Sequence, residues 1–136
     1  MASPTYRSTR TGIGKDVQMP FETVLEKTQV ELKKEGFGIL TRIDVKATMK
    51  EKLGADFSPF VILGACNPPL AHKALTLEPE VGLLLPCNVV VRDVGSGKIR
   101  VEAINAGTMA SLFPGSGLEE VSNEANSRLA RVIESI

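Results

Sequence analysis

The chain has 136 residues, 43% of them hydrophobic and 24% charged, with 16 basic residues balancing 16 acidic ones. This length suits one domain that buries roughly two-thirds of its unfolded surface, so residues 1–136 are expected to form a single domain. The balanced charge argues against a nucleic-acid partner, because nucleic-acid-binding faces usually carry a basic excess. No apolar run reaches the ~18 residues of a membrane span, and residues 1–17 lack the apolar stretch of a signal peptide. Together with only two cysteines, these features favour a cytoplasmic protein with free thiols.

The first elements in chain order are a strand and a helix. Residues 5–12, "TYRSTRTG", alternate and contain β-prone side chains, which predicts a first strand. From Pro20 to about Lys34, apolar residues recur at the i, i+3, i+4 spacing of an amphipathic helix. Pro20 suits the first helical turn, and Gly36 supplies the left-handed residue that ends the helix.

A strand, a short helix and a second strand are predicted next. Residues 37–45 alternate in hydrophobicity with a period of two, as a strand does. Asp44 is placed to cap a short helix that ends at Gly54. Residues 59–66, "PFVILGAC", are apolar at every position that a strand would direct to either face. This pattern predicts a central strand that is covered on both sides.

The next segment is predicted to hold a short helix and a β-hairpin. Asn67 is placed to cap a helix over residues 67–75. Residues 81–94 predict a long strand with an edge or a bulge at Pro86, because proline cannot donate to a strand ladder. A Gly-Ser-Gly turn then leads into an alternating strand over residues 98–104.

The last predicted element is a helix, for which Ser116 and Glu119 have the spacing of a capping box. The sum of these elements is an α+β domain. Its sheet is expected to have four or five mostly antiparallel strands, with the long first and last helices on one face and short inserted helices elsewhere.

Both cysteines and the single histidine lie between residues 64 and 91. Cys66 ends a predicted buried strand just before a helix. The positive end of that helix and free amides beside it would favour a thiolate, which is nucleophilic or metal-binding. Asn67 would cap the helix and orient a ligand. The alternative is that Cys66 is simply a small core residue.

Three other side chains complete this candidate site. Cys87 follows the strand-interrupting proline on a predicted core face, where it is either a core residue or is re-aimed by a bulge. Asn88 lies among apolar residues, and a buried amide there needs partners. His72 is either a surface histidine or a ligand that joins Cys66 and Cys87 in a soft trio for zinc or copper(I). Standard zinc spacings are missing, however, and a cysteine–histidine nucleophilic pair is a further alternative.

Three motifs carry a resemblance to a known family. They are "EGFGILTRIDVKATMKEKLG", "ILGACNPPLAHKAL" and "GLLLPCNVVV", and they resemble the bacterial domain of unknown function 302 family over about residues 21–104. The resemblance implies a β-α-β(4)-α fold of TBP-like type and assembly as a homodimer, but it brings no settled activity. The residues that match the most characteristic motifs are Gly64, Cys66, Asn67, Pro68, Pro86, Cys87 and Asn88.

These observations predict a cytoplasmic, homodimeric binding or sensing module with a paired-cysteine pocket. Its residues would be Cys66, Asn67, Cys87, Asn88 and His72, and its ligand a soft metal, a sulfur species or a small molecule; the metal and any cofactor stay unspecified. Neither nucleic acid nor a membrane is an expected partner. Two alternatives remain: a small thiol-dependent redox or sulfur-handling enzyme, and a structural dimer with no small-molecule site. The residues favour a non-catalytic role and leave the question of an enzyme open.

Overall fold

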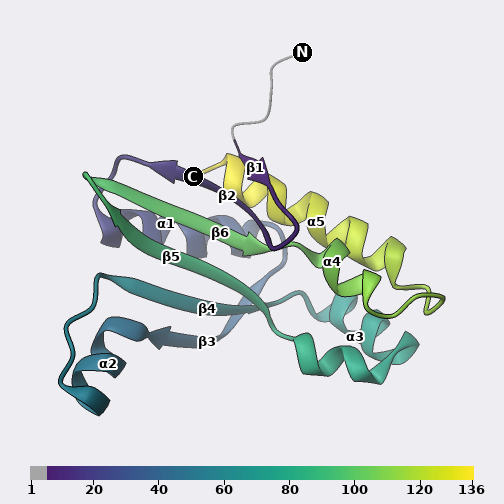
Figure 1. The fold of residues 1–136 in the computed structure, drawn as a ribbon. Coiled ribbons are helices and arrows are strands. Elements are labelled where there is room, and N and C mark those ends of the chain that lie inside the picture. Colours follow the sequence, from purple (N-terminus) through teal and green to yellow (C-terminus); the bar gives the residue numbers. More distant parts are fainter. Residues whose placement is uncertain (1–5) are drawn as a thin grey trace.

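The computed structural model describes residues 6–136, in which six antiparallel strands form one sheet (Figure 1). The strand order is β1-β2-β6-β5-β4-β3. The strands are β1 (Arg7–Ser8), β2 (Gly12–Val17), β3 (Gly38–Asp44), β4 (Phe60–Cys66), β5 (Cys87–Gly95) and β6 (Lys98–Ile104). The helices are α1 (Phe21–Lys34), α2 (Val45–Leu53), α3 (Pro68–Leu77), the 3-10 helix η1 (Pro79–Leu84), α4 (Ala106–Ser111) and α5 (Leu118–Glu134). The α+β class and the antiparallel sheet are confirmed, with six strands where the sequence predicted four or five.

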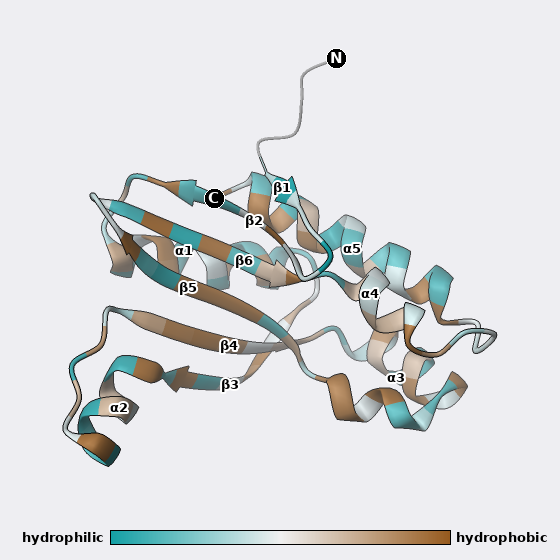
Figure 2. Ribbon diagram, in the orientation of Figure 1, coloured by the Kyte–Doolittle hydropathy of each residue, from teal (hydrophilic) through white to brown (hydrophobic). Residues whose placement is uncertain are grey.

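Helices α1 and α5 cover one face of the sheet and form the main core with it. Fully buried side chains meet there from both layers, among them Leu32 of α1, Leu63 of β4 and Leu129 of α5. The other face carries ion pairs, including Arg92 Nε with Glu102 Oε1 at 3.0 Å and Arg100 Nε with Asp16 Oδ1 at 2.6 Å. Figure 2 shows the apolar stretches along β4 and β5 and the polar outer side of α5.

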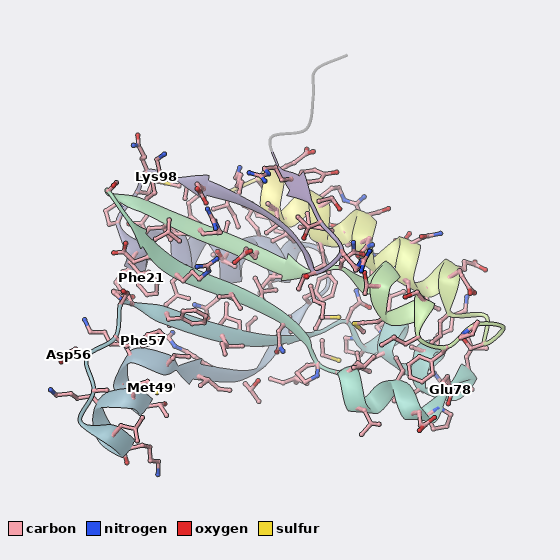
Figure 3. All side chains as sticks on the ribbon, in the orientation of Figure 1. Phe21, Met49, Asp56, Phe57, Glu78 and Lys98 are labelled. Carbon is pink, nitrogen blue, oxygen red and sulfur yellow. The ribbon has the colours of Figure 1, made fainter. Side chains whose placement is uncertain are left out.

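The first two helices begin where the sequence predicts. Helix α1 starts directly after Pro20, and α2 is capped by Asp44, whose Oδ1 accepts a hydrogen bond from Ala47 N at 2.9 Å. Helix α2 nevertheless contributes no buried side chain to the core. Figure 3 shows Met49, on α2, at the opposite end of the molecule from Glu78, at the end of α3.

The start of the chain differs from the single strand expected over residues 5–12. Residue 5 lies outside the described residues, and a turn closed by Thr9 N donating to Gly12 O at 2.8 Å separates the short β1 from β2. The sequence did not predict β2 as a separate strand, because its two glycines weaken the alternation of apolar and polar residues. Gly14 is needed there, since a Cβ at this position would lie 2.7 Å from Val101 O on the neighbouring strand.

The strand expected over residues 81–94 begins later than its hydrophobicity indicates. Residues Pro79–Leu84 form η1, and β5 starts only at Cys87, directly after a cis Leu85–Pro86 bond. Pro86 therefore precedes an interior strand, and the edge or bulge expected there is wrong; the register shifts lie in β3 and late in β5. The apolar run misleads because Val81 packs into a second apolar cluster instead of the sheet.

Two further expectations are corrected. Strand β4 is interior, but only one of its faces is fully buried, with Leu63 inside and Ile62 half-buried on the other face. The predicted capping box is wrong, because α5 starts after Gly117 and has no side-chain cap. Ser116 instead donates its hydroxyl to the Phe113 carbonyl at 2.6 Å.

Within residues 6–136, no helix is both long enough and apolar enough to cross a bilayer.

A matched pair of leucines tests where the core lies. Leu63→Ala is expected to lower the free energy of unfolding by about 2–5 kcal/mol, because Leu63 is 0% exposed in the main core. Leu53→Ala should change it by less than about 0.5 kcal/mol, because Leu53 is 74% exposed on α2. Urea denaturation measures both, and equal losses would contradict this description of the core.

Candidate functional site

A cavity of about 340 Å³ lies at one end of the sheet. Its walls come from the ends of β4 and β5 and from α3, η1, α4 and α5, and Figure 1 shows α3, α4 and the first part of α5 gathered there. The cavity lies where the main core meets a second cluster, whose buried members are Ala74, Val81, Met109, Ala110, Leu118 and Val121.

Small side chains on facing helices leave this space open. Ala71 and Ala74 lie three positions apart on α3, while Ala110 on α4 and Ala125 on α5 line the same cavity. Packed helix axes lie 8–10 Å apart, depending on the side chains between them. The methyl group of an alanine fills less of this space than a larger apolar side chain would. The lining contains no charged residue. Its volume and apolar walls are typical of a small-molecule site.

Both thiols line the cavity. Cys66 ends β4 and Cys87 begins β5. The strand register places Ala65 directly opposite Cys87, so Cys66 lies one residue beyond the partner of Cys87. Burial, and secondarily the neighbouring Cys66, raise the pKa of the Cys87 thiol to about 11. Cys87 is therefore a neutral thiol at physiological pH.

The first turn of α3 has no free amide to offer Cys66. Pro68 and Pro69 have no N–H group. Leu70 N donates to Asn67 Oδ1 at 3.3 Å, and Ala71 N donates to the Asn67 carbonyl at 2.9 Å. The expectation of unpaired amides beside Cys66 is therefore wrong. The first turn of α3 has no free N–H group that could stabilise a Cys66 thiolate by a hydrogen bond.

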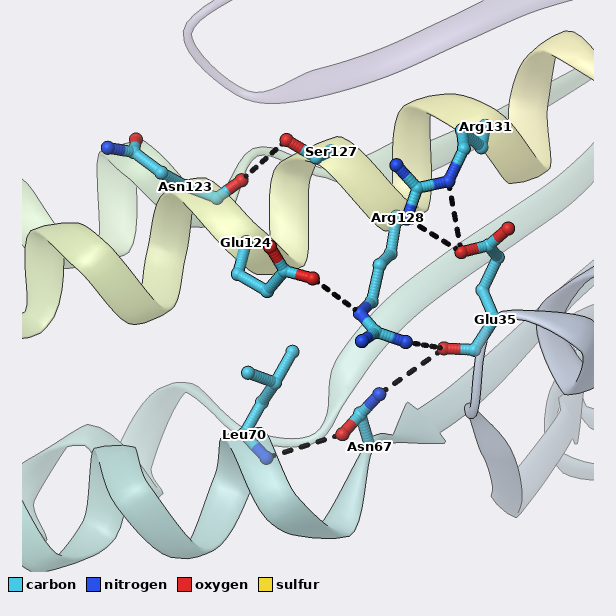
Figure 4. A network of polar contacts seen from close by, with 8 residues as sticks. All are labelled: Glu35, Asn67, Leu70, Asn123, Glu124, Ser127, Arg128 and Arg131. Atoms are coloured by element: carbon cyan, nitrogen blue, oxygen red, sulfur yellow. Dashed lines mark hydrogen bonds and ion pairs between the residues drawn. The ribbon is translucent and has the colours of Figure 1, made fainter.

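Asn67 is buried, and both ends of its amide are engaged within the protein. Its Nδ2 donates to the Glu35 carbonyl at 3.3 Å, and Arg128 Nη1 donates to the same oxygen at 3.0 Å (Figure 4). Gly36 has φ 84°, and a Cβ there would lie 2.9 Å from Asn67 Nδ2. Asn67 thus shapes the cavity wall by joining α3 to the end of α1, rather than by presenting a free amide.

The other two predicted site residues lie apart from the cavity. Asn88 is exposed and pairs with Gly64 across the strands, so the expectation of a buried amide is wrong. His72 is exposed on α3 and does not line the cavity. Across residues 6–136, no group of three or more His, Cys, Asp or Glu side chains is arranged to hold a metal ion. The trio of Cys66, Cys87 and His72 is not assembled.

The family model for the domain of unknown function DUF302 matches residues 13–136. The chain belongs to the DUF302 family. It is also similar to the crystal structure of an uncharacterized conserved DUF302 protein from Bacillus stearothermophilus, with 31% identity, a TM-score of 0.82, and coverage of 90% of this chain and 94% of that one. No curated protein gives a significant match.

The match confirms the family resemblance and extends it beyond residues 21–104 to the end of α5. Helix α5 is thus part of the DUF302 domain, and it supplies Ser122 to the cavity wall. The sequence analysis did not predict that Ser122 and the alanines line a cavity. The small residues spaced about one turn apart on α3 and α5 could have indicated a helix face with open space beside it. Homodimerisation and a cytoplasmic location stay predictions.

The contrast between two asparagines can be tested directly. Asn67→Ala is expected to lower the free energy of unfolding by about 1–3 kcal/mol, because it removes a helix cap and a bond to the Glu35 carbonyl. Asn88→Ala, on the exposed strand position, should change it by less than about 0.5 kcal/mol. Chemical denaturation compares the two, and a larger loss for Asn88→Ala would overturn these assignments.

The raised pKa of Cys87 predicts a pH dependence of stability. The unfolded thiol titrates near 9.0 and the folded one near 11, so between these values the unfolded chain loses its proton first and folding weakens as pH rises. The free energy of unfolding should fall by up to about 2 kcal/mol more in the wild type than in Cys87→Ala between pH 8 and pH 11. Urea denaturation across that range measures the difference, and parallel curves would disprove it.

Proposed function

We propose that this DUF302 protein is a binding module for a small, largely apolar molecule held in the cavity between α3, η1, α4 and α5. The observation that carries the proposal is a cavity of about 340 Å³ whose walls are almost entirely apolar and contain no charged residue. Pockets that bind small molecules begin at about this size and have this kind of lining.

Water is a poor occupant for such a space. A buried water needs two to four polar partners, whereas the lining offers mainly alanine, leucine, valine, methionine and proline side chains. An apolar ligand gains roughly 25 cal/mol for each Å² of apolar surface that it removes from water. The cavity therefore favours an organic ligand over solvent.

The thiols fit this function as part of the wall. Cys66 and Cys87 are uncharged, polarisable groups when protonated, and sulfur makes favourable contacts with apolar and aromatic ligands. A soft metal is less favoured because, within residues 6–136, no third His, Cys, Asp or Glu side chain joins the two thiols in an arrangement that could hold a metal ion. A thiol enzyme is less favoured because Cys87 is held neutral and the first turn of α3 has no free amide.

Toluene is a suitable probe of the cavity. At a concentration 100 times its Kd, it should stabilise the fold by about 2.7 kcal/mol and raise the melting temperature. Ala74→Phe is expected to abolish this rise, because the added ring occupies the cavity from α3. Ala47→Phe, on the exposed surface of α2, is the matched control and should keep the full response.

Thermal melts with and without toluene measure the response, and NMR chemical-shift changes locate it. Ala125→Leu fills the same cavity from α5 and provides a second variant if Ala74→Phe does not fold. The proposal fails if toluene does not bind the wild type, or if it binds a folded, filled variant equally well.

A further inference from the structure

Ser122 places a hydroxyl group in the otherwise apolar wall of the cavity. It lies on α5, lines the cavity and is only 9% exposed. Other helical hydroxyls of this protein bond to the carbonyl four residues earlier: Thr28 donates to Val24 at 2.7 Å and Ser127 to Asn123 at 3.0 Å. Among the hydrogen bonds within residues 6–136, by contrast, none involves the Ser122 hydroxyl.

The other polar groups of the lining are not available to a ligand in the same way. Both ends of the Asn67 amide are occupied by Glu35 and Leu70. The Cys66 and Cys87 thiols are only weak hydrogen-bond donors and acceptors. No buried side-chain nitrogen or oxygen within residues 6–136 lacks a hydrogen-bond partner, so the Ser122 oxygen is within reach of solvent. A ligand that displaces this solvent keeps its affinity only if one of its own groups bonds to the hydroxyl.

We propose that Ser122 binds the single polar group of the ligand, which is therefore a small, uncharged, apolar molecule with one hydroxyl or carbonyl group. This inference rests on the proposed function and names the ligand class. The lining contains no charged side chain, so a carboxylate or an amine would enter without a counter-charge and lose its hydration. The apolar part of the ligand would lie against the alanines of α3 and the two thiols.

Phenol and toluene are nearly the same shape and differ by the group that Ser122 would bind, so they form a matched pair of probes. Ser122→Ala is expected to weaken phenol binding about tenfold, since a hydrogen bond is lost and the phenol hydroxyl is buried without a partner. Toluene affinity should stay the same or rise slightly. Ser122→Thr, which retains a hydroxyl, should recover most of the phenol affinity.

Ser127→Ala is the control, because Ser127 is exposed on the same helix and does not line the cavity; both affinities should match the wild type. Isothermal titration calorimetry gives both dissociation constants for each variant. Equal affinity losses for phenol and toluene, or no loss for phenol, would overturn the role of Ser122 while leaving an apolar binding site. If neither probe binds the wild type, the proposed function itself is overturned.

Discussion

The backbone carbonyl of Glu35 is the point where three helices are joined. It follows the last turn of α1, where carbonyl groups have no partner inside the helix, and it accepts hydrogen bonds from Asn67 and Arg128. Asn67 begins α3 and Arg128 belongs to α5. Beside this junction, Arg131 donates to the Glu35 carboxylate at 2.9 Å and lowers the pKa of that carboxyl group. The junction fixes the start of α3 against α1 and α5, and the left-handed Gly36 lets the chain turn away from it into β3.

This anchoring explains why the protein has two apolar clusters instead of one. Helix α3 starts at the end of β4 and continues beyond the sheet, so its buried face meets α5 and η1 rather than the strands. Short side chains such as Ala74 and Ala125 stand where larger ones would join the two clusters. The cavity is therefore a gap in packing at the junction of the clusters. A ligand that fills it would complete the interior, and binding and folding stability would be linked.

The cavity combines an apolar lining with two thiols. Cys87 is held neutral by burial, and the two prolines at the start of α3 leave no free amide beside Cys66. The same apolar surroundings that keep the Cys87 thiol neutral suit an uncharged ligand, with Ser122 as its proposed polar contact. The two cysteine motifs of this DUF302 chain each contribute a thiol to the cavity wall.

The sequence by itself determined the local elements of this protein. Asp44 and Asn67 mark the starts of two helices because the side-chain oxygen of each accepts a hydrogen bond from the amide three residues later. The Gly-Ser-Gly turn closes the β5–β6 hairpin because its residues adopt positive φ. The sequence also predicted a site that contains both cysteines, and this stays a prediction. Only the tertiary structure decided that Asn67 bonds to a carbonyl 32 residues away, that an apolar run ending at Pro86 joins a second cluster, and that alanines from separate helices face one cavity. Such contacts join segments that are far apart along the chain. The spacing of residues within one segment predicts which face of that segment is apolar, but it does not determine which other helix packs against that face.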